Sequence, residues 1–75
     1  MEVGLDKLPL GVPGQVTQMK DSALCKRLTE FGLVPGTRVC SRYRTPGGSV
    51  TALEFRGTVV ALRTKDMALV RVEVL

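Results

Sequence analysis

The hydrophobic and polar positions of the chain change their period once, and this change predicts one helix among short strands. Leu24, Leu28 and Phe31 recur at helical spacing, which predicts an amphipathic helix over residues 21–32. A short helical turn, capped by Thr64, is expected over residues 64–68. Alternating or β-branched positions predict strands over residues 15–20, 37–45, 50–56, 58–63 and 69–75.

The end of the predicted helix carries several stop signals in succession. Gly32 can take the left-handed conformation that closes a helix, and Leu33 follows where such a cap often places an apolar residue. Pro35 forbids continuation of the helix, and Pro35-Gly36 fits the centre of a type II turn. These residues therefore have a structural role as cap and turn, and residue 37 is expected to begin a strand.

Glycine and proline mark the other corners of the chain. Turns are predicted at residues 12–14 and 46–49, and Gly57 permits a sharp bend between two strands. About five short strands with one inserted helix predict a mainly β fold, a small, strongly bent barrel that forms one domain over residues 1–75. The helix is expected to close one end of the barrel, with Leu24, Leu28 and Phe31 as the plug.

The composition argues against an enzyme or a metalloprotein. The chain has no histidine, and its carboxylates are scattered, so neither a general base nor a catalytic pair is visible. Cys25 and Cys40 are the only weak candidates for a metal site, because two thiols without histidine suit ferrous iron poorly. No catalytic residue, metal ligand or cofactor is therefore predicted. The N-terminus does not resemble a signal peptide, so a cytoplasmic location is expected.

A row of arginines is the most distinctive surface feature of the sequence. The net charge is +4, from 11 Lys+Arg against 7 Asp+Glu. Arg38, Arg42 and Arg44 alternate along one strand, on the face opposite Val39, Ser41 and Tyr43. This row could be a solvated outer face, a protein-docking surface or a nucleic-acid surface. A nucleic-acid surface also needs stacking aromatics, and Phe31 and Phe55 are expected in the core.

Three stretches of the chain together resemble one family. Residues 27–37 read RLTEFGLVPGT, residues 57–72 read GTVVALRTKDMALVRV, and residues 8–16 read LPLGVPGQV. In order and spacing they resemble the FeoA family, the small accessory proteins of bacterial ferrous iron uptake. The hairpin at residues 46–49 departs from the family, because it lacks a second proline after the glycines.

The resemblance implies an SH3-like barrel and a non-enzymatic role. It implies docking on FeoB, a membrane transporter with a cytosolic GTP-binding part, so that the chain meets the membrane only through this partner. It also implies a family label of transition metal ion binding, inherited from repressors that carry the same module. The predicted partner-binding residues are the following seven: Leu24, Leu28, Leu33, Val34, Arg38, Arg42 and Arg44.

Two points stay open at the level of sequence. The alternative function is a small basic barrel that binds nucleic acid, although no nucleic-acid partner is expected. The oligomeric state is also open, because a short barrel with exposed strand edges can pair edge to edge with another copy.

Overall fold

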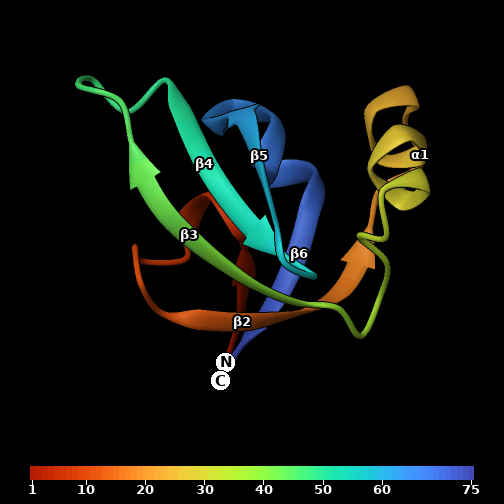
Figure 1. Ribbon diagram of the computed structural model, residues 1–75. Coiled ribbons are helices and arrows are strands. Elements are labelled where there is room, and N and C mark those ends of the chain that lie inside the picture. The colour runs from red at the N-terminus through yellow and green to blue at the C-terminus, as the bar shows by residue number, and fades with distance from the viewer.

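The computed structural model describes residues 1–75 as one six-stranded antiparallel sheet with a single α-helix (Figure 1). The strands are β1 (Glu2–Gly4), β2 (Pro13–Met19), β3 (Arg38–Arg44), β4 (Val50–Phe55), β5 (Thr58–Arg63) and β6 (Val70–Val74). The helices are α1 (Ala23–Glu30) and the 3₁₀ helices η1 (Leu5–Lys7) and η2 (Thr64–Leu69). The sheet order is β1-β6-β2-β3-β4-β5, and the two chain ends lie side by side. No helix has the length and apolarity that a membrane span requires.

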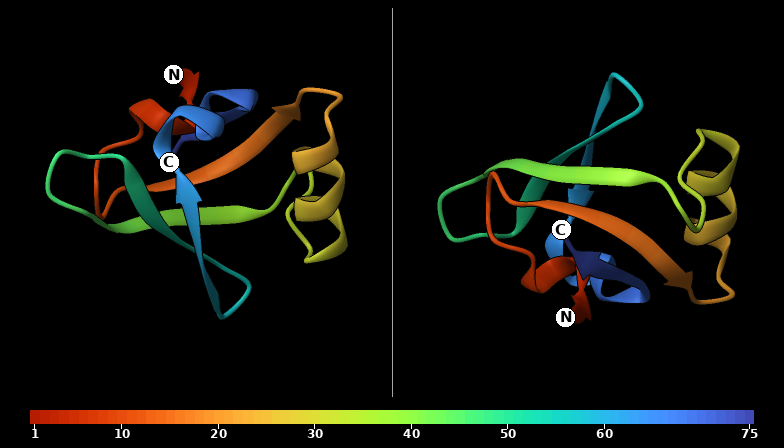
Figure 2. Two further views of the ribbon diagram at one scale, coloured as in Figure 1. Left: turned by 90° about the horizontal axis from the view of Figure 1, so that it is seen from above. Right: turned by 90° about the horizontal axis from the view of Figure 1, so that it is seen from below.

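The sheet bends into an open barrel around a core of thirteen buried residues (Figure 2). The register shifts between Val16 and Gln18 on β2 and between Ser41 and Tyr43 on β3. Such bulges increase the local twist and bend the strand. The predicted mainly β, strongly bent barrel is therefore confirmed. It has one strand more than expected, because β1 is only three residues long and its pattern was too short to detect.

The helix begins and ends near the predicted residues. The Ser22 hydroxyl caps its N-terminus by accepting a hydrogen bond from the Cys25 N–H at 3.1 Å. At the other end Gly32 has a φ of 100°. The Leu33 N–H donates to the Leu28 carbonyl and the Gly32 N–H to the Thr29 carbonyl, both at 3.0 Å. These two bonds form a Schellman motif, so the predicted cap is confirmed.

The turn after the cap is also as predicted, and Thr37 ties the two together. The Thr37 N–H donates to the Val34 carbonyl at 2.9 Å, and Gly36 has a φ of 95°. The buried Thr37 hydroxyl donates to the Gly32 carbonyl and accepts from the Val34 N–H. The start of β3 is thus fixed to the end of α1.

Two local predictions were wrong. The turn expected at residues 12–14 lies earlier, where the Val12 N–H donates to the Pro9 carbonyl and Gly11 has a φ of 79°. Pro13 already begins β2. Thr64 does not cap η2, because its hydroxyl forms a 2.8 Å hydrogen bond with the Thr51 hydroxyl instead.

The β4–β5 hairpin turns on only two residues. Arg56 and Gly57 have φ values of 52° and 76°, and Phe55 pairs directly with Thr58. Positive φ at both central residues identifies a type I′ turn, which matches the twist of the flanking strands. Gly57 therefore makes the sharp bend that the sequence predicted.

Candidate functional site

One side of α1 presents an apolar margin to solvent. At about 100° per residue, Cys25 lies on one side of Leu28 and Leu24 and Phe31 lie on the other. The barrel buries the Cys25 side, so Leu24 is half-buried and Phe31 is 63% exposed. Arg27 lies beside Leu24 and Phe31 on the same side of the helix. We call Leu24, Arg27 and Phe31 the α1 margin.

The burial of this region corrects three sequence-based expectations. Leu28 is 4% exposed and Leu33 is fully buried, so neither offers an apolar anchor to a partner. Their side chains belong to the core, as the C3 and C″ residues of a Schellman motif commonly do. Phe31 was expected in the plug but lies outside it. The helix packs on the barrel with the side that carries Cys25, and Phe31 is on the other side. Leu24 and Val34 remain partly accessible.

The arginine row is broken by the bulge in β3. Arg42 and Tyr43 are both exposed, so the alternation shifts by one residue and Arg44 turns to the same face as buried Thr51. The guanidinium of Arg44 donates to the carbonyls of Asp6 and Leu8 at 3.4 and 3.1 Å. Arg44 therefore holds η1 against β3, and the expectation that it belongs to an outer row was wrong.

The two remaining arginines of β3 differ in their partners. The Glu54 carboxylate accepts a hydrogen bond from Arg42 and raises the pKa of that guanidinium above its ordinary value. Arg38 is exposed and makes no ion pair. A continuous basic face, on which nucleic-acid binding would depend, is therefore not formed.

A shallow groove of about 250 Å³ connects β3 to the tip of the β4–β5 hairpin. Its lining includes Arg38, Cys40 and Arg56. Arg56 also reaches the helix end, because a Cβ added to Gly32 would lie only 2.8 Å from the Arg56 Cδ. The side chain of Arg56 therefore extends from the groove to Gly32, at the end of α1. Sequence reasoning missed this role, and the two-residue turn at Arg56-Gly57 is the signal that could have indicated it.

The residues of the chain do not form a metal centre. Both cysteines are free, Cys25 being part of the core and Cys40 part of the outer groove. No group of three or more His, Cys, Asp or Glu side chains comes together. Cys40 lies opposite Glu54 on β4, but one thiol and one carboxylate fall short of the four ligands of a usual zinc site, and Cys25 lies apart in the core.

A second hollow, of about 550 Å³, lies between the 46–49 hairpin and the start of η2. Its polar lining includes Arg63 and Lys65. Arg63 is already engaged, because its Nε lies 3.4 Å from the Asp66 carboxylate. Ser49 and Thr64 also line the hollow, and their hydroxyls form hydrogen bonds with Thr45 and Thr51 rather than with Lys65.

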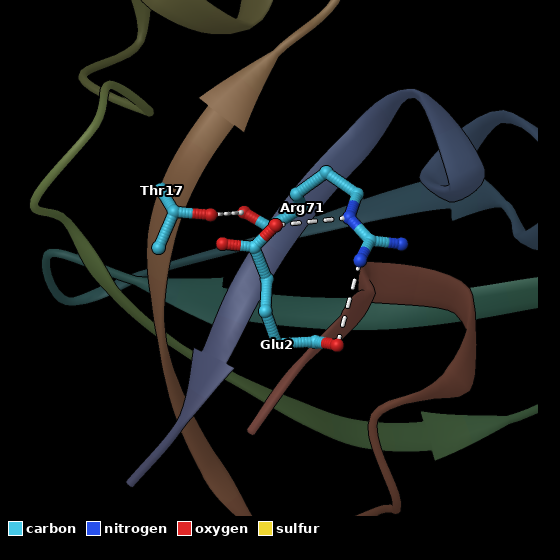
Figure 3. Close-up of polar contacts among 3 residues, drawn as sticks. All are labelled: Glu2, Thr17 and Arg71. Carbon is cyan, nitrogen blue, oxygen red and sulfur yellow. Dashed lines mark hydrogen bonds and ion pairs between the residues drawn. The ribbon is translucent and has the colours of Figure 1, made fainter.

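A polar cluster on the sheet fastens the first strand (Figure 3). Arg71 of β6 donates from Nε to the Glu2 carboxylate at 3.2 Å and from a terminal nitrogen to the Glu2 carbonyl at 3.4 Å. The neighbouring Thr17 hydroxyl and the Arg71 guanidinium hold the pKa of Glu2 below its ordinary value. The cluster joins β1, β2 and β6 and is structural.

This cluster predicts a pH-dependent contribution of Glu2 to stability. Because the pKa of Glu2 is lower in the folded state, its contribution is complete above the unfolded value of about 4.3 and is lost as the pH falls through the folded value. We expect Glu2→Gln to lower the free energy of unfolding at pH 7, and the difference from wild type to be smaller at pH 3. Urea titrations at both pH values measure this. An equal difference at pH 3 would contradict it.

Comparison with known proteins identifies a family and solved structures that are similar to this chain. The FeoA domain family matches residues 3–74. No curated protein sequence matches the chain. FeoA of Stenotrophomonas maltophilia in complex with zinc, described as an SH3 domain protein, is 29% identical with a TM-score of 0.85, over 95% of this chain and 89% of that chain.

Two further solved structures are similar over nearly the whole chain. Iron(II) transport protein A of Clostridium thermocellum is 27% identical with a TM-score of 0.89, over 97% of this chain and 46% of that chain. A FeoA-like protein of Clostridium acetobutylicum is 25% identical with a TM-score of 0.87, over 99% and 87%. The protein therefore belongs to the FeoA family of non-enzymatic accessory proteins of ferrous iron transport.

Proposed function

We propose that this chain acts by docking on the cytosolic GTP-binding part of a FeoB transporter. The observation that carries the proposal is the α1 margin, where an aromatic side chain is 63% exposed beside Arg27 and close to Arg56. Aromatic and arginine side chains dominate the binding energy of protein interfaces.

The docking surface consists of an apolar centre with a basic rim. Phe31, Leu24 and Val34 supply the apolar centre, and they lie at the margin of α1 and in the turn after it. Arg27, Arg38 and Arg56 form the rim, and none of them makes an ion pair within the chain. Rim charges orient a partner and speed its association, so the partner's matching face is expected to be acidic.

Calorimetric titration against the cytosolic part of FeoB tests this surface. We expect wild type to bind in at least one nucleotide state, and Phe31→Ala to weaken binding at least about tenfold, or about 1.4 kcal/mol. The matched control is Tyr43→Ala, because Tyr43 is 59% exposed but lies on β3 away from α1.

Two results would count against the proposal. Absence of binding in both nucleotide states at about 100 μM, within the weak regime, would contradict docking itself. An equal loss with Phe31→Ala and Tyr43→Ala would contradict the assignment of the surface to the α1 margin.

A further inference from the structure

The strand β5 has one edge that no other strand covers. It is the last strand of the sheet order and pairs with β4 without interruption over Thr58–Arg63. Its other principal contacts are with η2, which follows it in the chain. The tip of the hairpin that it forms with β4 projects beyond the neighbouring strands (Figure 2), and Arg56 at this tip lies next to Gly32.

In the β4–β5 hairpin, hydrogen-bonded and non-hydrogen-bonded residue pairs alternate, and this alternation determines which backbone groups of β5 have no partner on β4. In a two-residue hairpin the closing residues Phe55 and Thr58 exchange hydrogen bonds, and every second pair along the strands does the same. Val59, Ala61 and Arg63 lie at the alternate pairs, so their N–H groups and the C=O groups of Val59 and Ala61 point to the open edge. The Arg63 C=O is at the N-cap of η2 and accepts the first hydrogen bond of that helix. All three side chains are exposed.

This edge lacks the features that usually prevent pairing between chains. Between Thr58 and Leu62 it contains no proline, no lysine and no bulge. Its only charge is Arg63 at its end. An exposed, regular and apolar strand edge of this kind is a template for another strand.

We propose that β5 pairs antiparallel with β5 of a second copy of this chain, about a two-fold axis at Ala61. Ala61 then faces Ala61 of the partner subunit, and Val59 faces the partner's Arg63. The central pair exchanges two backbone hydrogen bonds and each outer pair forms one, from the Arg63 N–H to the Val59 carbonyl of the other copy, which gives about four across the junction. The same groups are otherwise exposed to water.

The side chains next to β5 favour a second copy over an unrelated extended peptide. Tyr43 pairs with Ala52 on β4, and Ala52 pairs with Ala61, so these three side chains form one row on the outer face. The two-fold axis continues the row with the same three residues of the second copy in reverse order, so the alanines lie at the centre and the tyrosines at the ends. The small central residues leave no steric obstacle.

The charges of the junction also tolerate the two-fold arrangement. Arg63 lies 3.4 Å from Asp66 of its own chain, and its aliphatic part would lie beside Val59 of the partner subunit. The two Arg63 residues are separated by four strand positions, about 13 Å, so they do not face each other. The net charge of +4 on each copy opposes association and is screened by salt. Dimerisation is therefore expected to strengthen at higher ionic strength.

Site-directed crosslinking tests the position of the two-fold axis. In a Cys40→Ser background, Ala61→Cys and Val59→Cys are each treated with a short bis-maleimide at high ionic strength. The thiols at position 61 would face each other, whereas those at position 59 would lie about 13 Å apart along the strands. We expect at least tenfold more covalent dimer with Ala61→Cys. Cys40→Ser alone measures the background from buried Cys25. Equal yields at the two positions would overturn the proposal.

Sedimentation equilibrium provides a second test with exposed substitutions that leave the fold intact. Val59→Lys places like charges opposite each other twice, which should weaken dimerisation about tenfold, whereas Val59→Glu should strengthen it. Leu10→Lys, at an exposed site away from β5, is the charge control and should change little. The proposal is overturned if wild type stays at the 8.1 kDa monomer mass at about 1 mM in 0.5 M salt, or if the two Val59 variants shift alike.

Discussion

Replacing Leu33 by alanine is expected to lower the free energy of unfolding by about 2–5 kcal/mol. Leu33 is fully buried, and its N–H closes the cap of α1 on the Leu28 carbonyl. The substitution leaves a cavity where the helix meets the barrel. A domain of this length has about 4–11 kcal/mol of stability in total, so the variant is expected to lose a large part of it.

Denaturant titration measures this loss, and Phe31→Ala is the matched control. Phe31 is 63% exposed, so its removal should change stability by less than about 0.5 kcal/mol. The two variants also separate stability from docking, since Leu33→Ala protein that is still folded should bind the partner normally and Phe31→Ala should not. A Leu33→Ala variant as stable as wild type would show that this side chain does not support the core.

The contrast between Leu33 and Phe31 shows how far the sequence could be interpreted. Helical spacing placed Leu24, Leu28 and Phe31 on one face, and that face exists. Spacing alone does not say which half of the face the barrel covers. The covered half depends on the path of the chain after the cap, where Leu33 enters the core and directs the helix.

The arginines of β3 show a second limit of the same kind. Alternation predicts the face of each residue only while the strand is regular. One extra residue in β3 moved Arg44 to the inner face, where it donates to the backbone of Leu8. The position of a bulge depends on the curvature of the whole sheet, so no local sequence pattern indicated this one. By contrast, caps and turns built on Gly32 and Pro35-Gly36 follow from local backbone sterics and were predicted correctly.

Replacing Gly32 by alanine is expected to destabilise the protein by about 2–3 kcal/mol. Part of the cost is the φ of 100°, which a residue with a Cβ rarely adopts. The rest is the contact with Arg56, whose Cδ would lie 2.8 Å from the new Cβ. Gly36→Ala is the matched control, because Gly36 has a φ of 95° and nothing within 4 Å of its Cβ position.

The control isolates what Arg56 contributes. Gly36→Ala should cost about 1–2 kcal/mol from backbone strain alone, and Gly32→Ala should approach that value in an Arg56→Ala background. Urea titrations of the four variants measure the coupling. Equal costs at the two glycines, unaffected by Arg56→Ala, would show that Arg56 does not pack on the cap. Because Arg56 also borders the groove of the docking surface, a side chain at position 32 would displace it. Gly32→Ala should therefore weaken partner binding more than Gly36→Ala does, which connects the helix cap to the proposed function.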